Sequence, residues 1–235
     1  MRRFLVASLA FLAISLVRPV RSEGERSPEP VPGWGTFVDP DGDCKAQVSP
    51  EGFVIEVPES LHDFWLGQKD PTRRLNAPRV TRMVKGDFRA RVRVVGDMVP
   101  GPALPGADIL PVISAGLYVW DRGNLILRWE RSLVDDPDRG LMLELAPKYD
   151  VGHIRLVEWK STQDAAYRDA PALWLQLERK GPRFTTSLSL DGQTWHSTSE
   201  VFTIFPDEVE VGILVVNGSA RPLTVGFQKL HIGQD

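Results

Sequence analysis

The sequence predicts an all-β protein, built as a sandwich of two antiparallel sheets. Hydrophobic residues recur at every second position through much of the chain, and turn-forming residues separate these runs. The 20 glycines and 19 prolines disfavour long helices. An open sheet of roughly a dozen strands would leave one apolar face in water, so two packed sheets are expected.

The strand-like runs are clearest in the second half of the chain and just before it. In FRARVRVV (88–95) the hydrophobic residues alternate with three arginines, which predicts a half-buried strand with a solvated arginine face. RFTTSLSL (183–190) alternates in the same way. Further strand-like runs are ALWLQLERK (172–180), HIRLVEWK (153–160), EVEVGILVV (208–216) and LTVGFQKLHI (223–232).

Two hairpin turns are indicated by their residues. YVWDRGNLILRW is expected to turn at residues 121–124, and SLDGQTW at the Asp191-Gly192 pair. The second of these is similar to the sugar-protein hairpin Ser-x-Asp-x-Gly-x-x-Trp, but Gly192 comes one residue too early. We therefore interpret it as a structural hairpin with Trp195 as a packing anchor.

The N-terminus has the pattern of a secretory signal. Arg2 and Arg3 precede the apolar run 4–17, whose 14 residues are too few to cross a bilayer comfortably. We expect a signal peptide over 1–22, with an uncleaved anchor as the alternative. The acidic, proline-rich stretch 23–33 then predicts a linker before a single folded domain at 34–233.

The net charge limits the classes of binding partner, and the cysteine count excludes an intramolecular disulfide. Loss of residues 1–22 removes four arginines and no acid, so the formal net charge changes from −3 to −7. A mildly acidic, secreted or periplasmic protein is not expected to bind nucleic acid, or a membrane once the signal is cleaved. Cys44 is the single cysteine, so no intramolecular disulfide is possible and Cys44 is expected to be buried.

Six stretches together carry a resemblance to a known family. They are DPDGDC (39–44), HDFW (62–65), NAPRVTRMVKGDFRARVRV (76–94), AGLYVWDRGNLILRWERS (115–132), LERKGPRFTTSLSLDGQTW (177–195) and VEVGILVVNGSARPLTVGFQKLHI (209–232). The chain resembles a secreted domain-of-unknown-function family of the concanavalin A-like lectin/glucanase superfamily, kin to the C-terminal sandwich domain of β-xylosidases. Over about 34–233 this resemblance implies a jelly roll with one concave sheet. It implies no activity, because the superfamily contains lectins, glycosidases, carbohydrate-binding modules and structural modules.

Candidate ligand-binding residues lie on the hairpin at 115–131. If its turn pairs Trp120 with Leu125, the aromatic residues share one face, and Arg128 and Glu130 lie on the other. Either face could pack in the core, and the sequence does not decide which one meets solvent. The candidate glycan-binding residues are therefore Tyr118, Trp120, Arg128, Trp129 and Glu130.

The sequence contains no strong pattern of catalytic residues. No glutamate is followed two positions later by an aspartate, as in many jelly-roll glucanases, and Glu130 and Glu158 each stand alone on a predicted strand. No metal-hydrolase histidine pair, nucleophile elbow or phosphate-binding loop is present. Two strands could still bring separate carboxylates together, so a glycoside-processing enzyme stays as an alternative.

Three aspartates alternate near the N-terminus, at Asp39, Asp41 and Asp43. Carboxylates spaced this way are typical of the first half of an EF-hand loop, but Gly42 comes one position early and Pro50 stands where the bidentate glutamate belongs. Either the stretch is a plain Asx turn, or it holds a structural calcium with ligands from another segment.

These observations predict an exported, lectin-like domain that binds a polysaccharide or glycan without cleaving it. A glycoside-processing enzyme of the same fold is one alternative. A structural or protein-interaction module of the cell envelope is the other.

Overall fold

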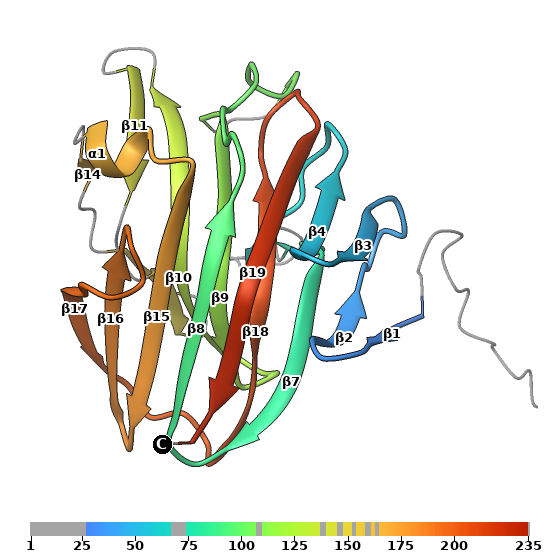
Figure 1. Cartoon of the computed structure of the whole chain (residues 1–235). Helices are drawn as coiled ribbons and strands as arrows, with labels where there is room; N and C mark the ends of the chain where they lie inside the picture. Colours follow the sequence, from blue (N-terminus) through green and yellow to red (C-terminus); the bar gives the residue numbers. More distant parts are fainter. Residues whose placement is uncertain are drawn as a thin grey trace, which may run out of the picture.

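The computed structural model describes residues 27–66, 74–106, 110–136, 140–144, 148–151, 154–157, 161–162 and 165–234, with the backbone alone over 136–165. Two large antiparallel sheets pack face to face in a β-sandwich, which confirms the predicted fold class (Figure 1). In the described part of the chain the single helix is the short α1 (Ala165–Arg168).

Sheet A lies behind in Figure 1. Its strand order is β1 (Glu29–Val31), β2 (Gly35–Val38), β7 (Arg79–Lys85), β18 (Glu208–Asn217), β9 (Val112–Trp120), β10 (Leu125–Asp136), β11 (Gly140–Glu144) and β14 (Ser161–Thr162). Off this path, β12 (Lys148–Val151) pairs with β10, and β13 (Ile154–Val157) pairs with β12.

Sheet B lies in front in Figure 1. Its strand order is β17 (His196–Phe202), β16 (Arg183–Ser189), β15 (Ala172–Lys180), β8 (Phe88–Val95), β19 (Leu223–Gly233), β4 (Gly52–Val57) and β3 (Lys45–Ser49). A separate two-stranded sheet joins β5 (Phe64–Trp65) to β6 (Arg74–Leu75).

The main core fills the space between sheets A and B. Its residues follow the period of two, so Val92 and Val94 of β8 are buried there while Arg91 and Arg93 point outward from the sandwich. The half-buried strand predicted over 88–95 is confirmed.

A second apolar cluster lies on the outer face of sheet A. The segment that carries β5 and β6, described over 58–66 and 74–78 and called here the covering segment, packs across this face. The Phe64 ring meets the Tyr118 ring edge-on, with centroids 5.1 Å apart. Because β9 and β18 are covered on both faces, their sequences are nearly continuous runs of apolar residues.

The N-terminal boundary needs a correction. Glu29–Val31, inside the segment predicted as a linker, form β1 and pair with β2. Pro30 has no N–H to donate, and it is tolerated because β1 is an edge strand. The predicted signal peptide lies outside the described residues. Within the described residues, no helix has the length and apolar character needed to span a membrane.

Candidate functional site

The hairpin of β9 and β10 carries the five predicted ligand residues, and its register differs from the prediction by one position. Trp120 pairs with Ile126 instead of Leu125. The Asp121 carboxylate accepts the backbone N–H groups of Gly123 and Leu125, at 2.7 and 3.0 Å, which extends the turn by one residue. Because side chains alternate, this shift moves every β10 side chain to the other face.

Trp129 is therefore on the opposite face from Tyr118 and Trp120. Its side chain is 0% exposed in the core between the sheets, and its Nε1–H donates to the Ser187 carbonyl oxygen of sheet B at 3.0 Å. The prediction that Trp129 shares a face with the two other aromatics is wrong. In the described structure Trp129 is a packing residue that joins the two sheets.

Arg128 and Glu130 lie with the two other aromatics on the outer face of sheet A, under the covering segment. The Arg128 guanidinium is 3.2 Å from the Asp63 carboxylate of that segment and 3.6 Å from the Glu130 carboxylate. Arg128, Glu130 and Tyr118 are buried, and Trp120 is half-buried. The structure thus brings these four predicted residues together, but in a covered polar cluster instead of an open groove.

Glu210 of β18 is the other charged centre of this cluster. It accepts the Tyr118 hydroxyl at 2.8 Å and pairs with Arg122 at 3.0 Å and Arg79 at 3.6 Å. Burial, with the neighbouring Glu210 charge, raises the pKa of Tyr118 well above its usual value, so this hydroxyl stays protonated. Glu130, considered above for catalysis, is ion-paired here, and the side chain of Glu158 lies outside the described residues.

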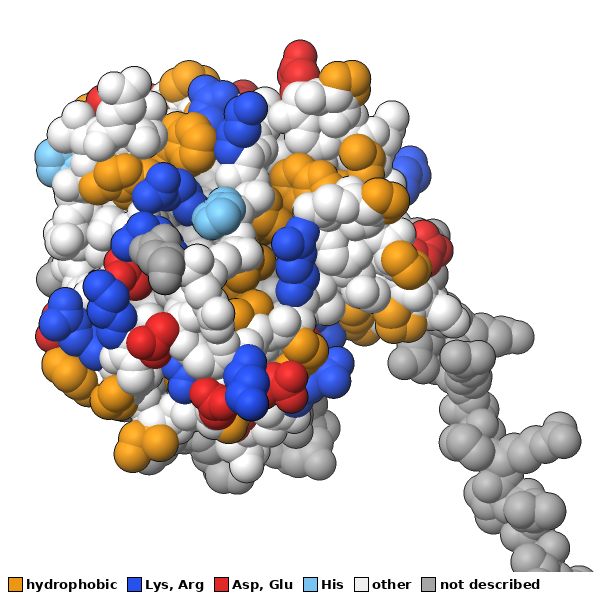
Figure 2. All heavy atoms as spheres, turned by 60° about the horizontal axis from the view of Figure 1, so that its bottom comes forward, with side chains coloured by type: hydrophobic (Ala, Val, Ile, Leu, Met, Phe, Trp, Pro, Cys, Tyr) orange, Lys and Arg blue, Asp and Glu red, His pale blue; other side chains and the backbone are white. Residues whose placement is uncertain are grey.

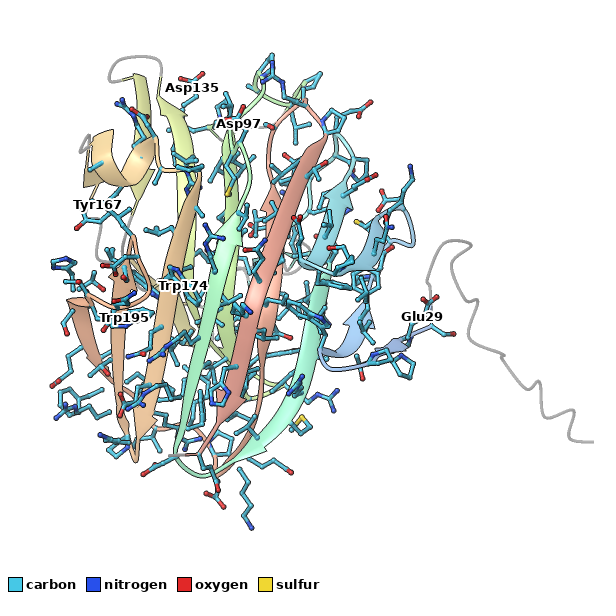
Figure 3. The ribbon with its side chains drawn as sticks, in the orientation of Figure 1. Glu29, Asp97, Asp135, Tyr167, Trp174 and Trp195 are labelled. Atoms are coloured by element: carbon cyan, nitrogen blue, oxygen red, sulfur yellow. The ribbon has the colours of Figure 1, made fainter. Side chains whose placement is uncertain are left out.

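The outer face of sheet B has no counterpart of the covering segment in the described part of the chain, although the turn around Gly192 lies against Trp174 (Figure 1). Trp174 of β15 and Trp195, which precedes β17, lie close together on this face (Figure 3). The Arg91 guanidinium lies 4.7 Å from the centre of the Trp195 ring, within cation–π distance. Arg91 also donates twice to the Gln176 amide oxygen, at 3.1 and 2.6 Å.

The turn at Asp191-Gly192 positions both tryptophans and confirms the predicted hairpin. Asp191 accepts backbone N–H groups of the turn, chiefly those of Thr194 and Gln193, and these bonds lower the pKa of its carboxyl group. Gly192 has a φ of 75° and lies against the Trp174 ring, where an added Cβ would come within 2.7 Å of a ring atom. A glycine is therefore required for this close approach.

The same face continues across β19. Arg93 donates to the Gln228 amide oxygen at 2.6 Å, and an open hollow of about 240 Å³ lies beside Gln228, with Gly52, Gly96 and Gly226 among its lining residues. Neither Arg91 nor Arg93 has a carboxylate partner among the described residues. Seen from its lower end, the molecule shows basic side chains among hydrophobic ones on this side (Figure 2).

The sequence pattern alone did not indicate this surface. From the pattern, the arginine row was predicted to be an ordinary solvated face and Trp195 a packing anchor, and nothing pointed to Trp174 or Gln176. The period of two places Trp174 and Gln176 on one face of their strand. The pairing of β15 with β8 then sets Gln176 opposite Arg91, and that pairing cannot be taken from either strand alone.

The aspartate stretch forms a turn, as one of the two interpretations predicted. Asp39 accepts the N–H groups of Gly42 and Cys44 at 3.2 and 3.0 Å, and burial raises the pKa of its carboxyl group. Each Asp39 oxygen thus accepts one N–H group of the turn, and the calcium role of Asp39, Asp41 and Asp43 stays a prediction. Cys44 is buried, as expected.

Comparisons with known proteins support the fold. No family model and no curated protein matches the sequence. A functionally unknown protein from Saccharomyces cerevisiae is similar in structure, with a TM-score of 0.63, 18% identity, and coverage of 86% of this chain and 96% of that one. The GH43 protein BlXynB from Bacillus licheniformis gives a TM-score of 0.51 at 14% identity, over 76% of this chain but 32% of that protein. The class of protein defined here is thus a β-sandwich domain whose fold also occurs as part of a larger GH43 protein.

Proposed function

We propose that this protein is an exported carbohydrate-binding domain without catalysis, and that the outer face of sheet B is its glycan-binding surface. The observation that carries the proposal is the group formed by Trp174, Trp195, Arg91 and Gln176 on an uncovered face. Sugars present apolar C–H faces that pack on flat aromatic rings, and hydroxyl groups that bond to guanidinium and amide groups. This group offers both kinds of contact side by side.

The covered face of sheet A supports the choice of surface. A ligand that contacted Tyr118, Arg128 or Glu130 would first have to displace the covering segment and break the 3.2 Å pair between Arg128 and Asp63. Removing one partner of a buried ion pair costs up to about 3–5 kcal/mol, and Glu130 would stay 3.6 Å from Arg128. The tryptophans of sheet B need no such rearrangement.

The fold similarity to part of a GH43 protein is compatible with a carbohydrate-related role. Export rests on the pattern of residues 1–22, and N-terminal sequencing of the protein recovered from a secreting host tests it. A new N-terminus near residue 23 is expected. Retention of Met1 in the mature protein would favour the uncleaved anchor.

The binding test is a pull-down of purified protein on a panel of insoluble polysaccharides, with a reducing-sugar assay on the supernatant. We expect retention on at least one polymer without sugar release. Trp195→Ala and Arg91→Gln should each weaken retention at least ~10-fold, which corresponds to about 1.4 kcal/mol. Met83→Ala removes a hydrophobic side chain that is 48% exposed on β7 of sheet A, away from the proposed surface, and it serves as the control for non-specific adsorption.

The other outcomes separate the alternatives. Sugar release would replace the proposal with the glycoside-processing enzyme. Absence of retention on every polymer would favour the structural or protein-interaction module. An equal loss in Met83→Ala and Trp195→Ala would show that retention is non-specific and would contradict the proposed surface.

A further inference from the structure

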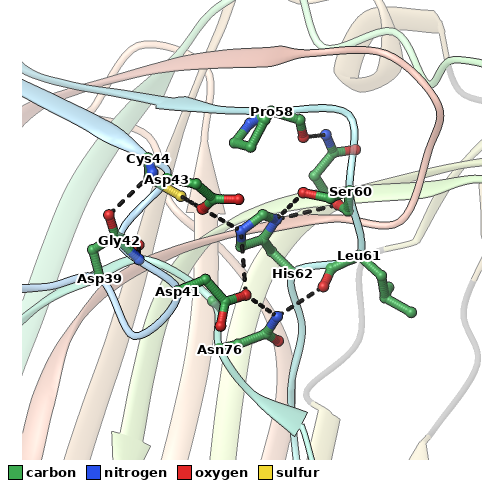
Figure 4. A network of polar contacts seen from close by, with 12 residues as sticks. Asp39, Asp41, Gly42, Asp43, Cys44, Pro58, Ser60, Leu61, His62 and Asn76 are labelled. Atoms are coloured by element: carbon green, nitrogen blue, oxygen red, sulfur yellow. Dashed lines mark hydrogen bonds and ion pairs between the residues drawn. The ribbon is translucent and has the colours of Figure 1, made fainter. Parts of the chain in front are cut away.

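The turn at 39–44 meets the covering segment at His62, where the ligating atoms of Asp43, Cys44 and His62 converge, with Asp41 beside them (Figure 4). The Nε2 atom of His62 is 2.9 Å from Asp43 Oδ1 and 3.7 Å from Asp41 Oδ2. The sulfur of Cys44 is 3.4 Å from the same Asp43 oxygen. The ligating atoms of Asp43, Cys44 and His62 all lie within 4.8 Å of one another.

Burial and hydrogen bonds hold His62 in one position. The residue is 0% exposed, and its backbone N–H and C=O both pair with Asn217 of β18, at 2.9 and 3.1 Å. Its Nδ1 atom lies 3.2 Å from the Ser60 carbonyl oxygen, which can only accept a hydrogen bond. The Ser60 hydroxyl also lies 3.3 Å from Nδ1. In the tautomer that donates through Nδ1–H to the carbonyl oxygen, the lone pair of Nε2 faces two carboxylate oxygens and is available to a cation. A backbone carbonyl behind the ring is also the usual outer partner of a metal-bound histidine.

In the described part of the chain, the aspartates around His62 have no other basic side chain to balance their negative charge. Among the described residues, no lysine or arginine lies within ion-pair distance of Asp39, Asp41 or Asp43. The three carboxylates make this point electronegative, which favours the binding of a cation. The side chains of Asp41 and Asp43 are 45% and 44% exposed, so the cluster has an open side through which an ion can enter.

We propose that Asp41, Asp43, Cys44 and His62 bind one divalent transition metal of the zinc class. A thiolate, an imidazole and carboxylates are ligands that zinc prefers, whereas calcium takes oxygen ligands alone. In a tetrahedral zinc site with bonds of about 2.0–2.3 Å, ligand atoms are about 3.3–3.6 Å apart. The 3.4 Å distance agrees with this geometry, and the 2.9 Å pair lengthens by about 0.4 Å. Asp41 lies outside the group of ligand atoms that are all within 4.8 Å of one another, so its half-exposed carboxylate, 3.7 Å from His62 Nε2, turns toward the other three on metal binding.

The metal binds with release of the Cys44 thiol proton to solvent. Its role is structural: it ties the N-terminal turn to the covering segment, which packs over the outer face of sheet A. The site is separate from the proposed glycan surface on sheet B.

The test is metal titration of the purified full chain after removal of bound metal with a chelator. We expect one Zn²⁺ per chain, with Ca²⁺ weaker by at least ~100-fold, and a thiolate charge-transfer band when Co²⁺ replaces Zn²⁺. Asp43→Asn should weaken Zn²⁺ binding by ~100-fold or more. Cys44→Ala should abolish the Co²⁺ band. Asp207→Asn, which changes a carboxylate that is 66% exposed elsewhere, is the matched control and should bind like the unchanged protein.

Cys44 and His62 are buried, so their variants can lose folding for reasons unrelated to metal. Asp41→Asn and Asp43→Asn change half-exposed side chains and keep the test decisive. Absence of Zn²⁺ binding by the unchanged, folded chain would overturn the proposal in favour of a histidine held by hydrogen bonds. Equal Zn²⁺ affinity in Asp43→Asn, or tighter Ca²⁺ than Zn²⁺ binding, would overturn it as well.

Discussion

Trp129 tests the register of the β9–β10 hairpin most directly. Its ring is wholly buried between the sheets, and its Nε1–H donates to the Ser187 carbonyl oxygen of the opposite sheet. Truncation of a buried tryptophan to alanine costs about 3–5 kcal/mol. The buried Ser187 carbonyl oxygen loses its side-chain donor, which adds about 1 kcal/mol. Trp129→Ala should therefore lower the free energy of unfolding by about 4–6 kcal/mol, a large part of the 5–15 kcal/mol typical of a domain.

The measurement is urea unfolding of the unchanged protein and two variants. Trp129→Phe keeps most of the ring volume but loses the hydrogen bond, so it should cost about 1–3 kcal/mol and separate the packing contribution from the hydrogen bond. Both variants should keep polysaccharide retention under conditions in which they are folded. A loss of stability below about 1 kcal/mol in Trp129→Ala, together with loss of retention, would refute the reasoning and place the ring on a ligand surface.

Three further predictions concern the sheets and the open face. Glu210→Ala leaves the Arg79 charge buried with a lost partner, so urea unfolding should show a loss of about 3–5 kcal/mol. Gly212→Ala places a Cβ 1.8 Å from a carbonyl oxygen of the paired β7, so this variant should unfold at a much lower urea concentration than the unchanged protein. The hydrogen bond from Lys180, with the Arg89 charge, lowers the pKa of Glu178 below 4.5 in the folded state. Its stabilising effect is therefore present above pH 4.5 and is lost as pH falls through the lowered pKa, a dependence that Glu178→Gln should flatten.

Each of these has an outcome that would contradict it. Glu208→Ala removes an exposed carboxylate two residues from Glu210, and equal losses in the two variants would argue against a buried ion pair. A Gly212→Ala protein as stable as the original would mean that β18 and β7 are not paired in this register. For Glu178→Gln, an unchanged pH profile of the unfolding free energy would show that its ion pairs are screened by solvent.

The local sequence pattern was sufficient to predict the strands and one turn. The alternation in 88–95 and 183–190 requires strands with one buried face, because side chains alternate across a strand whatever it pairs with. The Asp191-Gly192 pair marks a hairpin because glycine reaches positive φ without steric cost. These features depend on residues within a few positions of one another, so they could be predicted from the sequence.

The faces of the sheets depend on contacts that local pattern does not contain. The Asp121 carboxylate lengthened one turn by a single residue and so moved Trp129 into the core. Whether Arg128 and Glu130 meet solvent depends on Asp63 and Phe64, which arrive from a segment more than sixty residues earlier in the chain.

The candidate sites were decided by the same kind of distant pairing. Gln176 meets Arg91 across 85 positions of sequence, and Asp43 meets His62 across 19. The sequence by itself determined that strands form, which positions along each strand are polar, and that the strands build a β-sandwich. Only the tertiary structure decided which faces are covered and which polar residues meet, because those contacts depend on strand register and on packing between segments far apart in the chain.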